Sequence, residues 1–380
     1  DLAEARHVLR QSFISCITIA VMLSAEGVAI SQSLPHRLGG GEDICRDASL
    51  YFLIFSLGIP FAQLNSLCSG MLRCSGNMHI PSLLNILMCL LDVVFNYFLI
   101  FPSREVCGIM VPGANLGVAG AGLGTLLSFI VCSLTMCWFV CVRSRELNLR
   151  QDTGTFRPQR HTLREAVRIA LPLAVEHIVL CGAQIVSTII VAPLGTVAIA
   201  ANSFGITVEA LCYMPGYGIS DAATALVGQS LGAKRPRLAR SFGRITVGMG
   251  IAIMTVMAVV MYVFSPALMS VMTPDESVRA LTVNVLRIEA LAEPMFAASI
   301  VCYGVFVGAG DTLIPCSMNL GSIWVVRIVL AALLAGTMGL QGVWIAMAIE
   351  LTFRGIIFLL RFRTDSWMQK ALKKAAASSK

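Results

Sequence analysis

The chain has 380 residues, of which 57% are hydrophobic and only 13% carry a formal charge. A soluble domain carries about 25% charged residues, so the composition excludes a soluble globular protein and indicates an integral membrane protein. The net charge of +7 would suit a nucleic-acid partner, but the distribution of charge along the chain, given below, argues against one.

Apolar runs long enough to cross a bilayer follow one another along the chain. A helix needs about 20 residues to span a hydrocarbon core of about 30 Å. The joints are marked by Gly39-Gly40-Gly41, Pro102, Pro112-Gly113 and Pro193-Leu194-Gly195, because Gly and Pro interrupt helices. We therefore predict ten membrane helices, at 10–33, 48–73, 79–102, 116–142, 163–193, 196–230, 241–265, 280–308, 312–336 and 338–362.

One long interior segment is hydrophilic. Residues 143–162 are polar and carry several Arg, which favours a linker between two halves. The predicted organisation is an N-terminal lobe at 1–142 with four helices, the linker at 143–162, a C-terminal lobe at 163–363 with six helices, and a basic tail at 364–380. The predicted fold class is an all-α integral membrane protein, a two-lobed helical bundle.

The positions of Lys and Arg predict the orientation in the membrane. With the linker in the cytoplasm and the helices alternating from there, most of the 28 basic residues fall on the cytoplasmic side, together with the C-terminus. Only Arg37, Arg46, Arg104 and Arg279 fall on the outer side. Positive charge collects in cytoplasmic loops of membrane proteins, so this asymmetry explains the net charge without nucleic acid. The tail can lie on anionic lipid or remain solvated.

The two halves share a repeated pattern. Gly70-x5-Gly76-Asn77-x3-Pro81 recurs 234 positions later as Gly304-x5-Gly310-Asp311-x3-Pro315. The same displacement pairs Arg6 with Arg240, Arg10 with Arg244, Pro60 with Pro294, Cys68 with Cys302 and Asn85 with Asn319. Duplicated hydrophobic units are typical of secondary transporters.

The repeat also predicts a longer first half. The second unit begins near residue 163, so its counterpart would begin about 70 residues before Asp1. Two additional helices there would give both lobes six helices, in place of four in the first and six in the second. The absence of an initiator Met agrees with that expectation. On this hypothesis 1–380 lacks two helices, and a non-functional fragment is one interpretation.

The 13 cysteines lie mostly within predicted helices. No pair has metal-ligand spacing, and Cys137-x3-Cys141 lacks partners in the sequence, so we expect small buried hydrophobic side chains. Cys45 and Cys107 both fall on predicted outer loops, where an external disulfide is the alternative.

Ionisable residues inside the bilayer are candidates for function, since a charge at mid-membrane costs at least about 2.5–3.5 kcal/mol. The candidates are Glu26, Asp92, Glu176, Glu209, Glu289, Glu293, Arg327, Glu350 and Arg354. Pro294 is expected to bend its helix directly after Glu293. Glu350 and Arg354, one turn apart, favour a structural pair, and Arg327 can pair with an acid across the lobe.

Asn85, Asp92 and Asn96 are spaced 7 and 4 apart and therefore share one helix face. A carboxylate flanked by amide oxygens suits a hard cation such as Na⁺, whereas a desolvated Asp alone could carry a proton. A buried polar cluster that locks helices together is the structural alternative.

Glu176 lies a little over one turn after Pro172, and Gln184 follows two turns later. If it faces a central cavity, its carboxylate would attract a cationic substrate or carry a coupling proton; otherwise it reaches the headgroups. Glu209 and Glu293 are further candidates for these roles. Residues that could line a cavity, or pack in the core instead, are Tyr213, Tyr217, Met214 and Met88.

Several stretches together resemble the multidrug and toxic compound extrusion (MATE) family, in its bacterial branch. They are 171–176 (LPLAVE), 192–196 (APLGT), 213–218 (YMPGYG) running to 227–233 (VGQSLGA), Glu293-Pro294 and 308–312 (GAGDT). The resemblance implies a twelve-helix, two-lobed exporter driven by Na⁺ or H⁺ entering the cell. Relatives use an Asn/Asp pair four apart and a Thr from the next helix as a cation site. Here Asp92 precedes Asn96, with Thr125 following, and this reversed order leaves the ion open.

The sequence therefore predicts a secondary antiporter of the bacterial inner membrane. It would exchange cationic or amphipathic small molecules for Na⁺ or H⁺, without another cofactor, as a monomer in lipid. A lipid-linked-oligosaccharide flippase of the same architecture would need a basic cavity, whereas the membrane acids outnumber Arg287, Arg327 and Arg354. A Walker motif and a Gly-x-Ser-x-Gly motif are both absent from the sequence, which argues against ATP-driven transport and against an enzyme.

Overall fold

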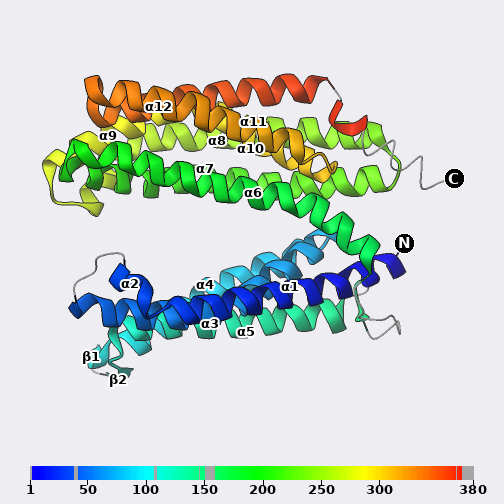
Figure 1. Ribbon diagram of the computed structural model, residues 1–380, viewed down its shortest axis with the longest axis horizontal. Coiled ribbons are helices and arrows are strands. Elements are labelled where there is room, and N and C mark those ends of the chain that lie inside the picture. The colour runs from blue at the N-terminus through cyan, green and yellow to red at the C-terminus, as the bar shows by residue number, and fades with distance from the viewer. Residues whose placement is uncertain are drawn as a thin grey trace. The chain divides into compact units, whose positions relative to one another are not determined.

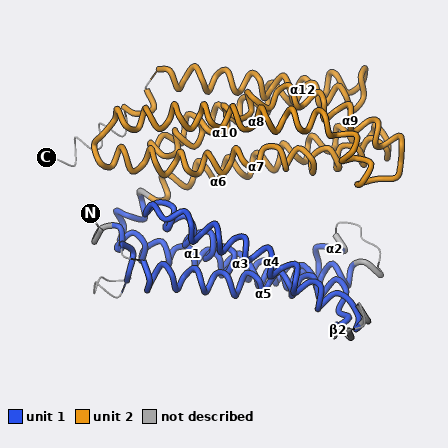
Figure 2. Tube along the Cα trace, turned by 180° about the vertical axis from the view of Figure 1, so that it is seen from behind, with its two compact units in different colours: residues 1–165 blue, residues 166–380 orange. Residues whose placement is uncertain are grey.

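The computed structural model describes residues 2–37, 42–106, 109–144, 146–149, 159–364 and 366–369. Within this part of the chain, nine helices are long and apolar enough to cross a membrane, or ten if one bent pair of helices counts as a single span. The chain divides into two compact units, residues 1–165 and 166–380 (Figure 2). The all-α membrane fold predicted from the sequence is confirmed. Gly39-Gly40-Gly41, Cys107, half of the predicted linker and most of the predicted tail lie outside the described residues.

Unit 1 is a bundle of long helices (Figure 1). Its helices are α1 (Leu2–Ile30), the short α2 (Ser33–Arg37), α3 (Glu42–Cys74), α4 (His79–Ile100) and α5 (Gly117–Trp138), which continues into a π-helical turn, η1 (Phe139–Arg143). Within the bundle, α3 packs against α1 and α5, and α4 packs along α5. The core is apolar and is built from residues such as Leu9, Leu72 and Met136.

The connection between α4 and α5 is an antiparallel hairpin of β1 (Pro102–Val106) and β2 (Ile109–Ala114), with Arg104 opposite Val111. The sequence prediction took Pro102 and Pro112-Gly113 as joints and missed these strands. Pro102 does follow the end of α4 and begins β1, whereas Pro112 and Gly113 lie within β2.

Unit 2 contains the remaining helices (Figure 1). They are α6 (Arg160–Val191), the 3₁₀ turn η3 (Ala192–Leu194), α7 (Thr196–Gly232), α8 (Pro236–Met272), α9 (Glu276–Ala290), α10 (Glu293–Gly308), α11 (Leu313–Gly321), the π-helical segment η4 (Ser322–Ile328) and α12 (Val329–Arg363). The division from unit 1 falls just beyond the predicted linker.

Gly and Pro set the joints in unit 2. Gly195 adopts φ 100° after the 3₁₀ turn, so α7 begins at Thr196 as predicted. The chain bends by 57° between α9 and α10, which confirms the bend expected beside Pro294. Gly339 takes a non-helical conformation (φ 59°), and this break separates the last two predicted spans. At both positive-φ positions glycine is favoured because it lacks a Cβ.

The sequence repeat is visible in the local backbone of each unit. After α3, Gly76 has φ 88° and the Asn77 amide donates to the Leu72 carbonyl at 2.9 Å. After α10, Gly310 has φ 74° and the Asp311 amide donates to the Phe306 carbonyl at 2.9 Å. Both turns have the helix-ending pattern that places a glycine in the left-handed region. The Gly70 and Gly304 motifs therefore build the same turn 234 positions apart.

Two helices of unit 2 approach each other closely. The Ser220 hydroxyl of α7 donates to the Ile300 carbonyl of α10 at 2.9 Å, and Thr224 donates to the Gly304 carbonyl at 2.8 Å. A Cβ at Gly304 or Gly308 would collide with the α7 backbone. Small residues four apart allow such close packing in membrane proteins. The pairing fixes α7 against α10 and so positions the residues described next.

Candidate functional site

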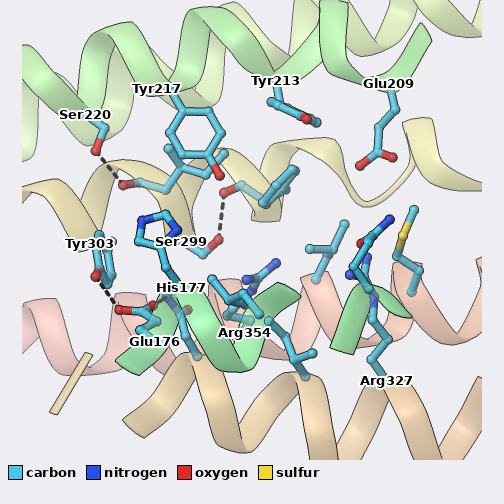
Figure 3. A pocket seen from close by; sticks show the side chains of 18 of the residues that line it. Glu176, His177, Glu209, Tyr213, Tyr217, Ser220, Ser299, Tyr303, Arg327 and Arg354 are labelled. Carbon is cyan, nitrogen blue, oxygen red and sulfur yellow. Dashed lines mark hydrogen bonds between the residues drawn. The ribbon is translucent and has the colours of Figure 1, made fainter. Parts of the chain in front are cut away.

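Unit 2 contains a cavity of about 600 Å³ (Figure 3). Its wall is formed by α6, α7, α10, α11, η4 and α12. Polar and aromatic side chains dominate the lining. They include Glu176, His177, Gln184, Glu209, Tyr213, Tyr217, Asp221, Phe296, Tyr303, Asn319, Arg327 and Arg354. Three of the predicted site residues, Glu176, Gln184 and Glu209, therefore share one cavity.

Two hydrogen bonds hold the Glu176 carboxylate in the cavity wall. The residue is 3% exposed. The Tyr303 hydroxyl donates to Oε2 at 2.5 Å, and the Asn319 amide donates to Oε1 at 2.6 Å. Hydrogen bonds to a charged group are stronger than those between neutral groups. The carboxylate is thus fixed by donors from α10 and α11, and the alternative in which Glu176 reaches the headgroups does not fit this position.

The sequence prediction missed both donors. Asn319 carried a signal, because it is the repeat counterpart of Asn85, but nothing in the sequence connected it to Glu176. Tyr303 had no distinguishing pattern.

One face of α7 presents an acid and two tyrosines to the cavity. Glu209, Tyr213 and Tyr217 follow at four-residue spacing, which places them on one helix face (Figure 3). The rings of Tyr213 and Tyr217 meet edge to face with centroids 5.6 Å apart. The interpretation of these tyrosines as cavity residues is confirmed. Met214 is largely exposed, and Met88 belongs to unit 1.

A buried charge network borders the same cavity. The Arg354 Nε lies 3.2 Å from Glu350 Oε1, and the Arg327 Nε lies 3.8 Å from Glu350 Oε2. The Ser322 hydroxyl donates to Glu350 Oε1 at 2.5 Å. The predicted Glu350–Arg354 pair is confirmed, and Arg327 finds its acid in Glu350. The π-helical segment η4 supplies both Ser322 and Arg327.

Two further acids are completely buried near the α9–α10 bend. Within the described residues, both carboxylate oxygens of Glu289 lack a hydrogen-bond partner. Glu209, Arg327 and Glu350 contribute to the electrostatic environment of Glu289. Glu293 lies next to the Cys212 thiol and does not line the cavity. An unpartnered buried anion is costly, so these positions suit a bound proton or cation.

The candidate cation site of unit 1 is only partly assembled. Asp92 and Asn96 each have a buried Oδ1 atom for which the described part of the chain provides no hydrogen-bond partner. The Asn96 amide lies against Gly124 of α5, the residue before Thr125. Within the described residues, no hydrogen bond joins Asp92, Asn96 and Thr125.

Thr125 and Asn85, the other polar residues predicted for this site, already form hydrogen bonds with other groups. Thr125 donates to the Ala121 carbonyl of its own helix at 3.2 Å. The Asn65 side-chain amide of α3 donates to Asn85 Oδ1 at 3.2 Å. The sequence did not predict this contact.

Glu26 is exposed on α1. Among the described residues, no group of three or more His, Cys, Asp or Glu has a metal-binding arrangement.

Known relatives share most of this chain. The Probable multidrug resistance protein NorM of Thermotoga maritima is 27% identical over 336 residues, which cover 87% of this chain and 69% of that protein. The Multidrug resistance protein MdtK of Yersinia enterocolitica is 26% identical over 393 residues, covering 98% of this chain and 82% of that protein.

Solved structures agree on the fold. A MATE protein in complex with MaL6 has a TM-score of 0.86 at 21% identity, covering 97% of this chain and 80% of that one. A MOP superfamily transporter from Pyrococcus furiosus, described as having a binding pocket of reverse polarity, has a TM-score of 0.85 at 20% identity, covering 94% and 78%.

The MatE family profile matches residues 1–98 and 172–333. These two segments include Asp92 and Asn96 of α4 and, in unit 2, Glu176 with both of its hydrogen-bond donors. The chain therefore belongs to the MatE family, the multidrug and toxic compound extrusion family, and is a multi-pass membrane transporter rather than an enzyme.

Proposed function

We propose that this protein is a secondary antiporter that exports cationic or amphipathic small molecules in exchange for Na⁺ or H⁺. The observation that carries the proposal is the Glu176 carboxylate, held by Tyr303 and Asn319 in the wall of an aromatic cavity. Relatives named for multidrug resistance support an export role.

The cavity suits a flat organic cation. Tyrosine faces attract cations, and the attraction strengthens when water is excluded. Tyr213 and Tyr217 supply such faces, and Glu209 adds a carboxylate on the same side of α7. The cavity volume of about 600 Å³ lies within the usual range of small-molecule sites, about 300–1,000 Å³.

Coupling requires that the ion and the substrate prefer different states of the transporter. Glu176 can be neutralised by a proton or a cation, and its attraction for a cationic substrate then falls. The unpartnered oxygens of Asp92 and Asn96 support a second ion position in unit 1. Thr125 would join it as a ligand by turning its hydroxyl oxygen towards the ion.

A flippase for lipid-linked sugars remains the second candidate for this architecture. Such a protein needs uncompensated positive charge for a pyrophosphate. In the described cavity, Arg327 and Arg354 share Glu350, and Glu176, Glu209 and Asp221 add negative charge. This balance favours a cationic cargo.

We further propose that the protein lies in a bacterial inner membrane, as a monomer in lipid, with a cytoplasmic C-terminus.

The test is transport in vesicles. The purified protein is reconstituted without ATP, and efflux of a fluorescent cationic dye is followed under an imposed Na⁺ or proton gradient. We expect gradient-dependent efflux that Glu176→Gln reduces by about tenfold or more. The matched control is Glu276→Gln, because the Glu276 side chain is 87% exposed at the start of α9. Efflux that is equal with and without either gradient would overturn the antiporter assignment.

A further inference from the structure

The cavity of unit 2 contains charges of both signs, and they are separated in space. Glu176 lies on one side of the close view, whereas Glu209 and Arg327 lie on the other (Figure 3). Apart from His177, the basic side chains of the described lining are Arg327 and Arg354. The two ends of the cavity therefore differ in charge, and the proposed function assigns the two arginines no role in cargo binding.

A series of contacts connects these arginines to the part of α7 that carries Glu209. The Arg354 guanidinium lies over the Phe296 ring, 5.3 Å from its centroid, and the centroids of Phe296 and Tyr213 are 5.7 Å apart. Glu209 lies one turn before Tyr213 on the same face of α7. Among the described residues, neither arginine forms an ion pair with Glu209, although both contribute to its electrostatic environment.

Glu350 holds the two arginines unequally. Its carboxylate lies 3.2 Å from the Arg354 Nε but 3.8 Å from the Arg327 Nε, and the side chains of Arg354 and Arg327 are 10% and 21% exposed. Arg354 is thus the closer partner of Glu350, and Arg327 is the more accessible cation of the cavity wall. Two positive charges share this one carboxylate, so Glu209 is the lining acid that remains on this side to balance the second charge.

The π-helical segment η4 accompanies a change in the direction of Arg327. α11 begins at Leu313 and α4 at His79, which are repeat counterparts 234 positions apart. α4 is α-helical throughout the matching stretch, whereas η4 interrupts the helix of unit 2. The counterpart of Arg327 is Val93, which is 67% exposed, whereas Arg327 lines the cavity. π-helical turns often occur at functional sites, and this one places a charge in the cavity wall.

We propose that Arg327 determines cargo specificity: it neutralises the Glu209 end of the cavity, so that the cavity accepts organic cations with a single charged group, held at the Glu176 end. The inference rests on the proposed binding of cationic cargo. A second cationic group would meet Arg327, and repulsion between like charges strengthens where water is excluded. The faces of Tyr213 and Tyr217 lie between the two ends and would hold the uncharged body of the cargo (Figure 3).

The test compares two ligands that differ in one charge. Decamethonium carries a trimethylammonium group at each end of an alkyl chain, and its monocationic analogue has a hydroxyl group in place of one of them. Binding of each ligand to the purified full chain in lipid nanodiscs is measured by isothermal titration calorimetry, without an ion gradient. We expect the unaltered protein to bind the monocation about tenfold more tightly or better, and Arg327→Gln to reduce this preference by about tenfold or more.

Three variants control for structure and for charge. Arg327→Gln leaves Glu350 paired with Arg354 at 3.2 Å, so the buried carboxylate keeps a partner. Arg327→Lys retains the charge and should keep the preference of the unaltered protein. Arg279→Gln is the matched control, because it removes a positive charge of unit 2 that pairs with the exposed Glu276 rather than facing the cavity, and it should also keep the preference. Adding Glu209→Gln to Arg327→Gln should restore the preference for the monocation, since the second ammonium group then loses its carboxylate.

The unaltered protein already decides part of the question. Equal or tighter binding of decamethonium by the unaltered protein would overturn the inference, whatever the variants do. The same preference in the unaltered protein and in Arg327→Gln would also overturn it, while cation binding and the proposed function would stand. Binding of neither ligand would contradict the proposed cation cavity itself, and the inference with it.

Discussion

A carboxylate inside a membrane protein takes its properties from the few groups that touch it. Glu176 has one donor on each oxygen, and the two donors come from different helices. These two donors fix the position of the buried charge. Glu176 differs in this respect from Glu289, whose oxygens have no hydrogen-bond donor among the described residues. This difference makes Glu176 the residue at which small changes should have the largest effect on transport.

Tyr303→Phe removes one of these donors and keeps the ring. A hydrogen bond to a charged group contributes about 1.5–3 kcal/mol, and about 1.4 kcal/mol corresponds to a tenfold change. We expect gradient-driven dye efflux to fall by about tenfold or more. Tyr262→Phe is the control, because Tyr262 lies on α8 and its ring faces Arg287 of α9 rather than the cavity. Equal efflux by both variants at matched expression would argue against a role for the Tyr303 hydroxyl.

Neutral isosteres test the two proposed ion positions separately. Asp92→Asn and Glu176→Gln keep shape and remove the group that binds a cation or proton, so each should reduce efflux by about tenfold or more, a loss of about 1.4 kcal/mol. Dye efflux from vesicles measures both variants. If Asp92→Asn is silent while Glu176→Gln is inactive, coupling belongs to unit 2 alone. Normal efflux by both would remove both assignments.

Glu350 should matter for stability. Its carboxylate is fully buried between Arg327 and Arg354, and removing one partner of a buried ion pair costs about 3–5 kcal/mol. Glu350→Gln should therefore lower the unfolding temperature in detergent, measured by a thermal-shift assay. Glu276→Gln, whose side chain is exposed beside Arg279, should change it little, since surface pairs contribute about 0–1 kcal/mol. Equal unfolding temperatures would contradict the structural role of the network.

At the level of helices, the close approach of α7 and α10 determines the shape of the cavity. The Ser220 and Thr224 hydroxyls bond to carbonyls of α10 only because Gly304 and Gly308 present no side chain there. Both helices also carry cavity residues, so a change in their separation reaches Tyr217 and Tyr303 together.

Gly304→Ala should push these helices apart. The new Cβ would meet the Ser220 backbone, and overpacking of this kind costs about 1–3 kcal/mol. We expect a lower unfolding temperature together with weaker dye binding. Gly248→Ala is the matched control, because Gly248 lies within α8 and nothing lies within 4 Å of the added methyl group. A Gly304→Ala protein as stable as Gly248→Ala would show that the contact tolerates a methyl group.

The sequence predicted the positions of the helices more reliably than the contacts between them. Apolar length and the Gly and Pro joints placed the helices, including the turn at Gly195 and the bend beside Pro294, because these signals are local. The helix ends were less predictable: α1 begins at Leu2 and α8 runs to Met272, since helices continue beyond the apolar stretch. The site required tertiary information, as Tyr303 and Asn319 lie 127 and 143 positions from Glu176. Charge inside a predicted span identified Glu176, but no local pattern identifies its donors.

At the scale of the whole molecule, the prediction to be tested is the orientation of the chain in the membrane. The basic residues predict that the C-terminus and the 143–162 segment face the cytoplasm. Some of these residues also have structural partners: Arg361 pairs with Asp311, and Arg6 donates to the Glu146 carbonyl at 3.0 Å. Such contacts do not weaken the rule, because the rule acts on charge during insertion, before the helices pack.

We therefore expect opposite results from reporters on the two predicted faces. Green fluorescent protein fused after Lys380 should fluoresce, and alkaline phosphatase at that position should be inactive. Alkaline phosphatase placed after Thr273, between α8 and α9, should be active, because α8 is long enough to cross the membrane once between this turn and the loop at 234–235, which we predict to be cytoplasmic. Exchanging the reporters between the two positions is the control. An active phosphatase after Lys380 would reverse the orientation, and with it the direction in which a proton or Na⁺ gradient drives export.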